Sequence, residues 1–164
     1  MKRNGRKHIG GDMREARDWY NAGWNDPARA GEWYDLGWMD HPVEARKWYD
    51  AGWHDSEIAY EWYDAGWTIE EADRWYSAHW YNPYYTRVWY DAGWRDPYIA
   101  NEWDTELWSA GMAYKWYRAG WKDGGEACYW YRAGWDDPKE ALAWFKDGYD
   151  NPVEALKRYR KRKT

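Results

Sequence analysis

The chain of 164 residues has one cysteine, Cys128, and four widely separated histidines. A lone cysteine cannot form an internal disulfide, and no His-x₃-His or Cys-x₂-Cys spacing offers the ligands of a zinc site. No apolar run approaches the ~18 residues of a transmembrane helix, and no hydrophobic segment of a secretory signal follows the basic residues 1–8. We therefore expect no metal, no cofactor, no membrane insertion and a reducing compartment such as the cytoplasm, with Cys128 as a small buried side chain.

Catalytic patterns are lacking as well. Gly124-Gly125 is an isolated dipeptide outside any phosphate-binding or dinucleotide-binding motif. Aspartates and glutamates are numerous, but they fall at expected helix starts and on polar faces, and no pair stands out as an acid and a base. We infer that the protein is not an enzyme.

Tryptophan, in contrast, is abundant, and its spacing organises the whole chain. All 19 tryptophans belong to two columns of a repeat whose spacing is 13 to 15 residues, and the pattern is Trp-Tyr-x-Ala-Gly-Trp-x-Asp-Pro. Position 1 is Trp at residues 19, 33, 48, 62, 75, 89, 103, 116, 130 and 144. Position 6 is Trp at residues 24, 38, 53, 67, 80, 94, 108, 121 and 135, and then Tyr149.

Each repeat unit predicts one short helix and its connector. Position 8 is most often Asp or Asn, whose side chain caps a helix start, and Pro often follows, where its missing N–H costs nothing. Several units add Glu three residues after the cap, as in Asp12 and Glu15, which completes a capping box. The helix starts fall near residues 12, 26, 41, 55, 68, 82, 96, 109, 123, 137 and 151. His41 offers the poorest cap.

Position 5 is glycine in most units, and glycine adopts the left-handed conformation that ends a helix. In a Schellman ending the residue after this glycine contacts the residue four before the glycine. Both are Trp here, so each helix end should hold a Trp–Trp contact, such as Trp89 with Trp94. His79 and Leu107 replace the glycine in two units, and these two endings should differ.

Helices of about ten residues are marginal in isolation and must pack on their neighbours. The sequence therefore predicts an all-α fold, an α-solenoid of about eleven short helices built from a 14-residue Trp-rich repeat. We expect a basic flexible lead-in over residues 1–11, a helical repeat domain over residues 12–157 and a basic C-terminal tail over residues 158–164.

The unit resembles the tandem short-helix repeats of the type A-x-x-W-x-x-A-G-F found in bacterial and phage proteins, over roughly residues 12–157. The segment Ala45-Arg46-Lys47-Trp48-Tyr49-Asp50-Ala51-Gly52 is also similar to the second helix of a Sel1-like repeat, although that family's longer two-helix period is missing. The resemblance implies a helical repeat array but no particular activity. Because a regular repeat without a catalytic constellation is typical of such proteins, we expect a non-enzymatic structural or protein-interaction module, cytoplasmic or virion-associated, that is a subunit of a larger assembly.

The basic residues concentrate at the two ends. Between residues 11 and 156 the chain carries all 29 acidic residues and 14 of the 24 basic ones, which gives this body a charge of −15. An acidic body repels phosphate, so nucleic acid could bind only through the ends. The C-terminal candidates are Lys157, Arg158, Arg160, Lys161, Arg162 and Lys163. A solubilising end cap is the alternative role for these residues.

Protein binding is the remaining expectation, with another protein or a second copy as the partner. Tyr is favoured in protein interfaces, and Tyr81, Tyr84, Tyr85 and Tyr98 cluster in the irregular middle of the chain. The alternative for these tyrosines and for Tyr60, Tyr114 and Tyr129 is extra packing. A designed repeat scaffold without natural function is a third possibility.

Overall fold

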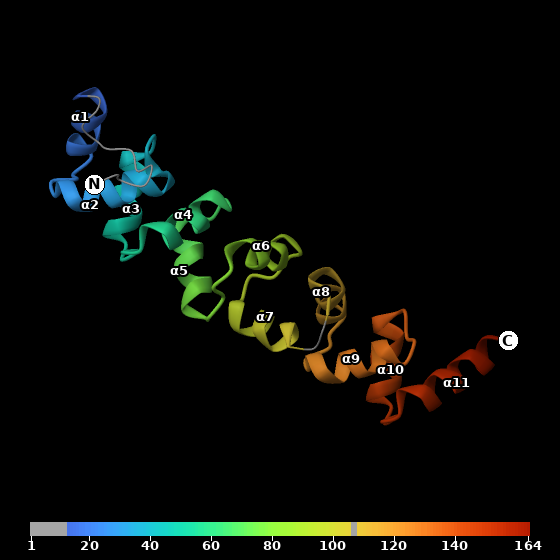
Figure 1. Cartoon of the computed structure of the whole chain (residues 1–164). Helices are drawn as coiled ribbons and strands as arrows, with labels where there is room; N and C mark the ends of the chain where they lie inside the picture. Colours follow the sequence, from blue (N-terminus) through green and yellow to red (C-terminus); the bar gives the residue numbers. More distant parts are fainter. Residues whose placement is uncertain (1–12, 106–107) are drawn as a thin grey trace, which may run out of the picture. The chain divides into compact units, whose positions relative to one another are not determined.

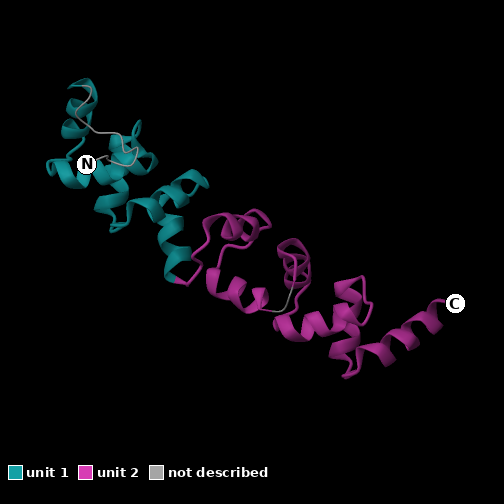
Figure 2. Cartoon of the chain, viewed as in Figure 1, with its two compact units in different colours: residues 1–77 teal, residues 78–164 magenta. Residues whose placement is uncertain are grey.

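The structure is a computed structural model that describes residues 13–105 and 108–164. Every element in these ranges is helical, and the chain divides into two compact units, residues 1–77 and residues 78–164 (Figures 1 and 2). The boundary falls inside the fifth repeat unit, directly after the last residue of its helix. The predicted lead-in at residues 1–11, the Asp12 cap and the ending at Leu107 lie outside the described residues.

The first unit holds five α-helices and one π-helical turn, η1. They are α1 (Met13–Asn21), α2 (Pro27–Trp33), η1 (Tyr34–Trp38), α3 (Pro42–Asp50), α4 (Ser56–Asp64) and α5 (Ile69–Ser77). Gly37 has φ +105° inside η1, so the helix that begins with α2 ends there. The neighbouring helices end at their own glycines in the same way. Within this unit α1 packs on α3, and α2 packs on α4.

Among its described residues, the second unit holds six helices. They are α6 (Pro83–Asp91), α7 (Pro97–Asp104), α8 (Ala110–Arg118), α9 (Gly124–Arg132), α10 (Pro138–Lys146) and α11 (Pro152–Lys163). Each helix again contacts the helix two positions further along the chain: α6 with α8, α7 with α9, α8 with α10, and α9 with α11. The predicted all-α solenoid of short repeats is confirmed.

The helix starts form as the sequence predicts. Each predicted Asp or Asn cap from Asp26 onward accepts hydrogen bonds from one or two backbone N–H groups of the following turn. Ser109 and Thr68 serve the two short connectors in the same way. His41 makes no side-chain cap bond, which confirms that it is a poorer cap than Asp or Asn.

The helix ends carry the Schellman pattern. The Trp94 N–H donates to the Trp89 carbonyl at 3.2 Å, and the Gly93 N–H donates to the Tyr90 carbonyl at 3.0 Å. The predicted contact within this end is confirmed, with the Trp89 and Trp94 ring centroids 5.4 Å apart. The glycine is required for space as well as for conformation at Gly37, where an added Cβ would lie 2.7 Å from the Tyr60 ring.

One expected difference is not found. His79 has φ +72°, so its backbone takes the same left-handed conformation as the glycines it replaces. Non-glycine residues pay roughly 1–2 kcal/mol for this conformation. The repeat geometry thus overrides the local preference of the residue.

The core of each unit is a continuous series of tryptophan rings, which we call the tryptophan ladder. Position 1 contacts position 6 of the same repeat, and position 6 contacts position 1 of the next. In the second unit the ladder runs from Trp80 to Trp144, with successive centroids 5.4 to 6.0 Å apart. In the first unit it runs from Trp19 to Trp75 with spacings of 5.2 to 6.3 Å. All these tryptophans are buried.

The two tryptophan columns differ in how they use the indole N–H. In most repeats the position-6 indole donates to the backbone carbonyl of the first residue of the helix two further on, as Trp121 does to Pro138 at 2.9 Å. The same bond is made by Trp24, Trp38, Trp80, Trp94, Trp108 and Trp135. The buried position-1 indoles of Trp33, Trp62, Trp103, Trp116 and Trp130 have no hydrogen-bond acceptor among the residues that the structure describes.

The last helix is longer than the others because its stop signal is missing. Position 5 of this repeat is Arg162 instead of Gly, and α11 continues to Lys163. The residues predicted as a basic C-terminal tail are therefore helical up to Lys163. Tyr159 of this helix packs on Trp135 and Trp144, with centroids 5.0 and 6.2 Å apart, and closes the ladder of the second unit.

Candidate interaction surfaces

The four tyrosines predicted to mark a contact face are all exposed, while the tryptophans beside them are buried. The exposed fractions are 57% for Tyr81, 52% for Tyr84, 47% for Tyr85 and 65% for Tyr98. Tyr84 and Val88 lie one helical turn apart on α6, and Val88 is 57% exposed. Exposed tyrosine beside an exposed apolar side chain is typical of protein-contact surfaces.

Two of these tyrosines are also held by neighbours. The Tyr85 hydroxyl donates a hydrogen bond to Asp104 of α7, and its ring stacks on Trp80 at 6.0 Å with an interplanar angle of 19°. The Tyr81 hydroxyl lies 2.6 Å from Nδ1 of His79. Burial raises the pKa of Tyr85, as does its bond to Asp104, while a hydrogen bond with Trp89 lowers it.

The other tyrosines outside the Trp-Tyr column divide between two roles. Tyr60 and Tyr114 pack over the glycines Gly37 and Gly93 and contact Trp38 and Trp94. Their role is extra packing, the alternative that the sequence left open. Tyr129 differs because 53% of it is exposed.

The basic side chains of α11 form the second candidate surface. Arg162 lies 4.6 Å above the Trp144 ring, Arg158 lies 5.6 Å above Tyr149, and Lys163 lies 4.9 Å above Tyr159. Hydrogen bonding to Tyr159 raises the pKa of Lys163. The positive charges also sit in the last turns of the helix, where they complement its dipole.

Lys157, Arg160 and Lys161, the other three basic residues of α11, are exposed as well. Lys157 forms an ion pair with Glu154 at 3.3 Å. All six predicted residues therefore lie on one helix. Three of them have aromatic support that keeps the charged groups at the surface.

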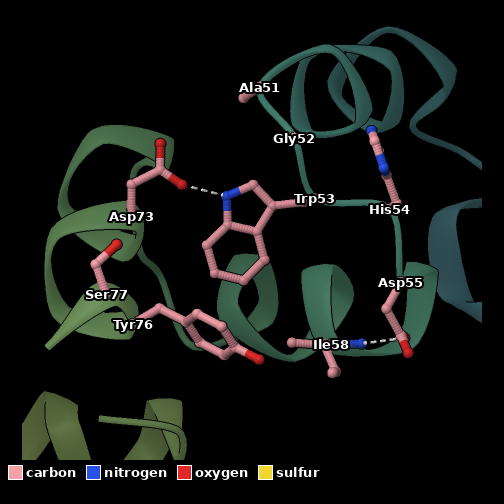
Figure 3. A pocket seen from close by; sticks show the side chains of 9 residues that line it. All are labelled: Ala51, Gly52, Trp53, His54, Asp55, Ile58, Asp73, Tyr76 and Ser77. Atoms are coloured by element: carbon pink, nitrogen blue, oxygen red, sulfur yellow. Dashed lines mark hydrogen bonds between the residues drawn. The ribbon is translucent and has the colours of Figure 1, made fainter. Parts of the chain in front are cut away.

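A hollow of about 200 Å³ in the first unit is lined by Trp53, His54, Asp73 and Tyr76, among others (Figure 3). Trp53 departs from the position-6 rule here, because its indole N–H donates to the Asp73 carboxylate at 2.5 Å (Figure 3). Asp55 in the same hollow caps α4. Both carboxylates are thus engaged in structural bonds.

Within residues 13–105 and 108–164, no group of three His, Cys, Asp or Glu side chains is arranged to hold a metal ion. No helix of these ranges combines the length and the apolar character needed to cross a membrane. Cys128 is buried, as predicted.

The structure reveals a tyrosine–carboxylate pair in the first unit that the sequence does not indicate. The hydroxyl of Tyr34, which is 3% exposed, donates to Oε2 of Glu15 at 2.8 Å. This bond, followed by burial and nearby acidic charges, raises the pKa of Tyr34 to about 12. The sequence pattern places Glu15 in a capping box, and the partners are 19 positions apart in the sequence, so no local pattern would reveal the pair.

Comparisons with known proteins add no relative. No family model matches the sequence, and no curated protein or solved structure matches it either. The resemblance to short-helix bacterial and phage repeats stays a prediction.

Proposed function

We propose that the protein is a non-enzymatic helical-repeat module that binds another protein or a second copy of itself, as a structural part of a larger assembly. The support comes from the contrast between the buried tryptophans and the exposed tyrosines. The repeat fold requires the former, whereas Tyr84 and Tyr98, exposed by 52% and 65%, contribute little to it. Large exposed aromatic side chains are common anchors of protein interfaces.

The test uses the full chain and a variant that carries Tyr84→Ser and Tyr98→Ser. Tyr129→Ser is the matched control because Tyr129 is 53% exposed on the same unit. Affinity purification from cells of the source organism, together with sedimentation of the pure protein, should recover a specific partner or a dimer. The double variant should lose it and the control should keep it. Equal recovery by all three proteins, or no association at all, would refute the proposal.

A second candidate function, nucleic-acid binding, is favoured by the six basic residues of α11. Lys157, Arg160 and Lys161 are exposed on this helix and do not support the aromatic core. Changing these three to Gln therefore tests charge without removing Tyr159, which packs against the ladder.

If α11 binds duplex DNA, a salt titration should show a weaker affinity for the triple variant. The slope of log K against log salt should become less negative by about 0.9 for each phosphate group that the variant no longer neutralises. Lys115→Gln, Lys122→Gln and Lys139→Gln on the same unit form the matched control. An affinity and a slope that the α11 changes leave unaltered would exclude this role for the helix.

A further inference from the structure

A tyrosine–carboxylate pair lies at the first ring of each tryptophan ladder. In the first unit Tyr34 contacts Trp19 at 5.8 Å, and its hydroxyl donates to Glu15. In the second unit Tyr85 stacks on Trp80 at 6.0 Å, and its hydroxyl donates to Asp104. The repeat pattern does not by itself produce a pair at both places, because Tyr34 occupies position 2 of its repeat whereas Tyr85 lies at a helix start.

The geometry supports one-electron chemistry. Ring centroids 5.4 to 6.0 Å apart place neighbouring indoles in direct contact through the second ladder. Chemically identical rings have similar potentials, so an electron vacancy created on one tryptophan can move to the next. Tyrosine is oxidised most readily when a base accepts its proton, and the Asp104 carboxylate is hydrogen-bonded to the Tyr85 hydroxyl.

Two other tyrosines of the second ladder differ from Tyr85 in this respect. Tyr117 and Tyr131 contact the tryptophans through their rings, with centroids 5.1 Å from Trp94 and 5.2 Å from Trp108. Neither hydroxyl donates to a carboxylate among the residues that the structure describes. Tyr131 is 39% exposed, so on oxidation its proton would pass to water, which is a weaker base than a carboxylate. Such tyrosines are less favourable end points for the vacancy.

We propose that each ladder carries oxidising equivalents to its tyrosine–carboxylate pair, Tyr34–Glu15 in the first unit and Tyr85–Asp104 in the second. A high-potential one-electron oxidant removes an electron from a ladder tryptophan and is itself reduced by one electron. The tryptophan radical cation then takes an electron from Tyr85, while the Tyr85 O–H bond breaks and its proton binds the Asp104 carboxylate. Neutral tryptophan, a neutral tyrosyl radical and a neutral aspartic acid result.

The two pairs differ in exposure, which predicts different lifetimes for the two radicals. Tyr85 is 47% exposed, so a diffusible small-molecule reductant such as ascorbate can reach its ring. Tyr34 is 3% exposed and is shielded from such a reductant. The second unit therefore discharges oxidising equivalents to solution, and the first unit retains them.

The experiment places a photo-oxidant at the far end of the second ladder. In the full chain Cys128→Ala removes the native thiol, and Thr164→Cys at the end of α11 is labelled with a ruthenium polypyridyl complex. Flash oxidation of ruthenium(II) to ruthenium(III), followed by rapid freezing and electron paramagnetic resonance, should reveal a tyrosyl radical. Tyr85→Phe should abolish most of this signal, and Tyr131→Phe should preserve it.

Two further variants separate a relay from a structural role. Trp94→Phe keeps an aromatic ring but interrupts the ladder where Trp94 joins Trp89 to Trp103, and it should suppress the Tyr85 radical. Asp104→Asn should slow radical formation and alter its solvent deuterium isotope effect while circular dichroism stays unchanged. A tyrosyl signal that survives Tyr85→Phe, or one that Trp94→Phe leaves intact, would overturn the proposal.

Discussion

Replacing Trp121 by phenylalanine should destabilise the protein more than the same replacement of Trp130. Both side chains are buried in the second unit, with 2% and 0% exposed. Both contact two other ladder tryptophans and Phe145. The two substitutions therefore remove similar apolar area, and this loss nearly cancels in the comparison.

The indole N–H groups account for the difference. Trp121 donates to the Pro138 carbonyl at 2.9 Å, a bond whose net contribution is about 1 kcal/mol. Trp130 has a buried N–H without an acceptor, which costs about 1–3 kcal/mol that the phenyl ring would recover. Trp121→Phe should consequently cost at least about 2 kcal/mol more than Trp130→Phe.

Urea denaturation monitored by far-ultraviolet circular dichroism can measure the two free energies of unfolding in the full chain. Benzothienylalanine at each position is the control, because it keeps the shape of the indole and replaces only the N–H. Equal costs would refute the reasoning. They would mean that the Trp130 N–H is satisfied by the face of Phe145, whose ring stands at 77° to it.

Three further predictions concern the helix ends and one titration. Gly37→Ala should cost more than Gly52→Ala in thermal denaturation, because both have φ near +105° but only Gly37 faces a tyrosine ring; equal costs would show that the ring moves aside. Asp96→Ala should cost about 1 kcal/mol in the same assay through the lost helix cap, and no change would mean that solvent replaces the cap. The pKa of Tyr34 is raised from 10.0 to about 12, so its hydroxyl stabilises the fold below pH 10 and this contribution is lost as the pH rises toward 12. Glu15→Gln should lower this pKa in a spectrophotometric titration, and an unchanged value would assign the shift to burial alone.

The fold was largely predictable because the repeat encodes it through local rules. An Asp or Asn cap, a following proline and a left-handed glycine each act within a few residues, so their spacing sets most helix starts from Asp26 to Asn151. The Trp–Trp contacts at helix ends follow from the same Schellman geometry. His79 shows the limit of local rules, since it adopts φ +72° although it is not glycine.

The interactions between repeats could not be predicted. The bond from Trp121 to Pro138 spans 17 residues, and the bond from Tyr34 to Glu15 spans 19. Both depend on how one helix is rotated on the next, which composition and period leave open. The same limit applies to the candidate surfaces: sequence located the exposed tyrosines, but it did not reveal that Tyr85 is bound to Asp104.

The indole bond to the second helix ahead has a consequence for cooperativity. A solenoid held only by nearest-neighbour contacts unfolds as a one-dimensional array, and its ends fray one repeat at a time. Here the indole of Trp94 is anchored to the start of α8, so the end of α6 is stabilised by a helix that is not its sequence neighbour. Loss of one helix therefore removes stabilising contacts from helices that precede it and from helices that follow it in the chain. Within each unit, the thermal unfolding transition should therefore be sharper than nearest-neighbour coupling alone would give. Fewer terminal repeats should unfold ahead of the rest.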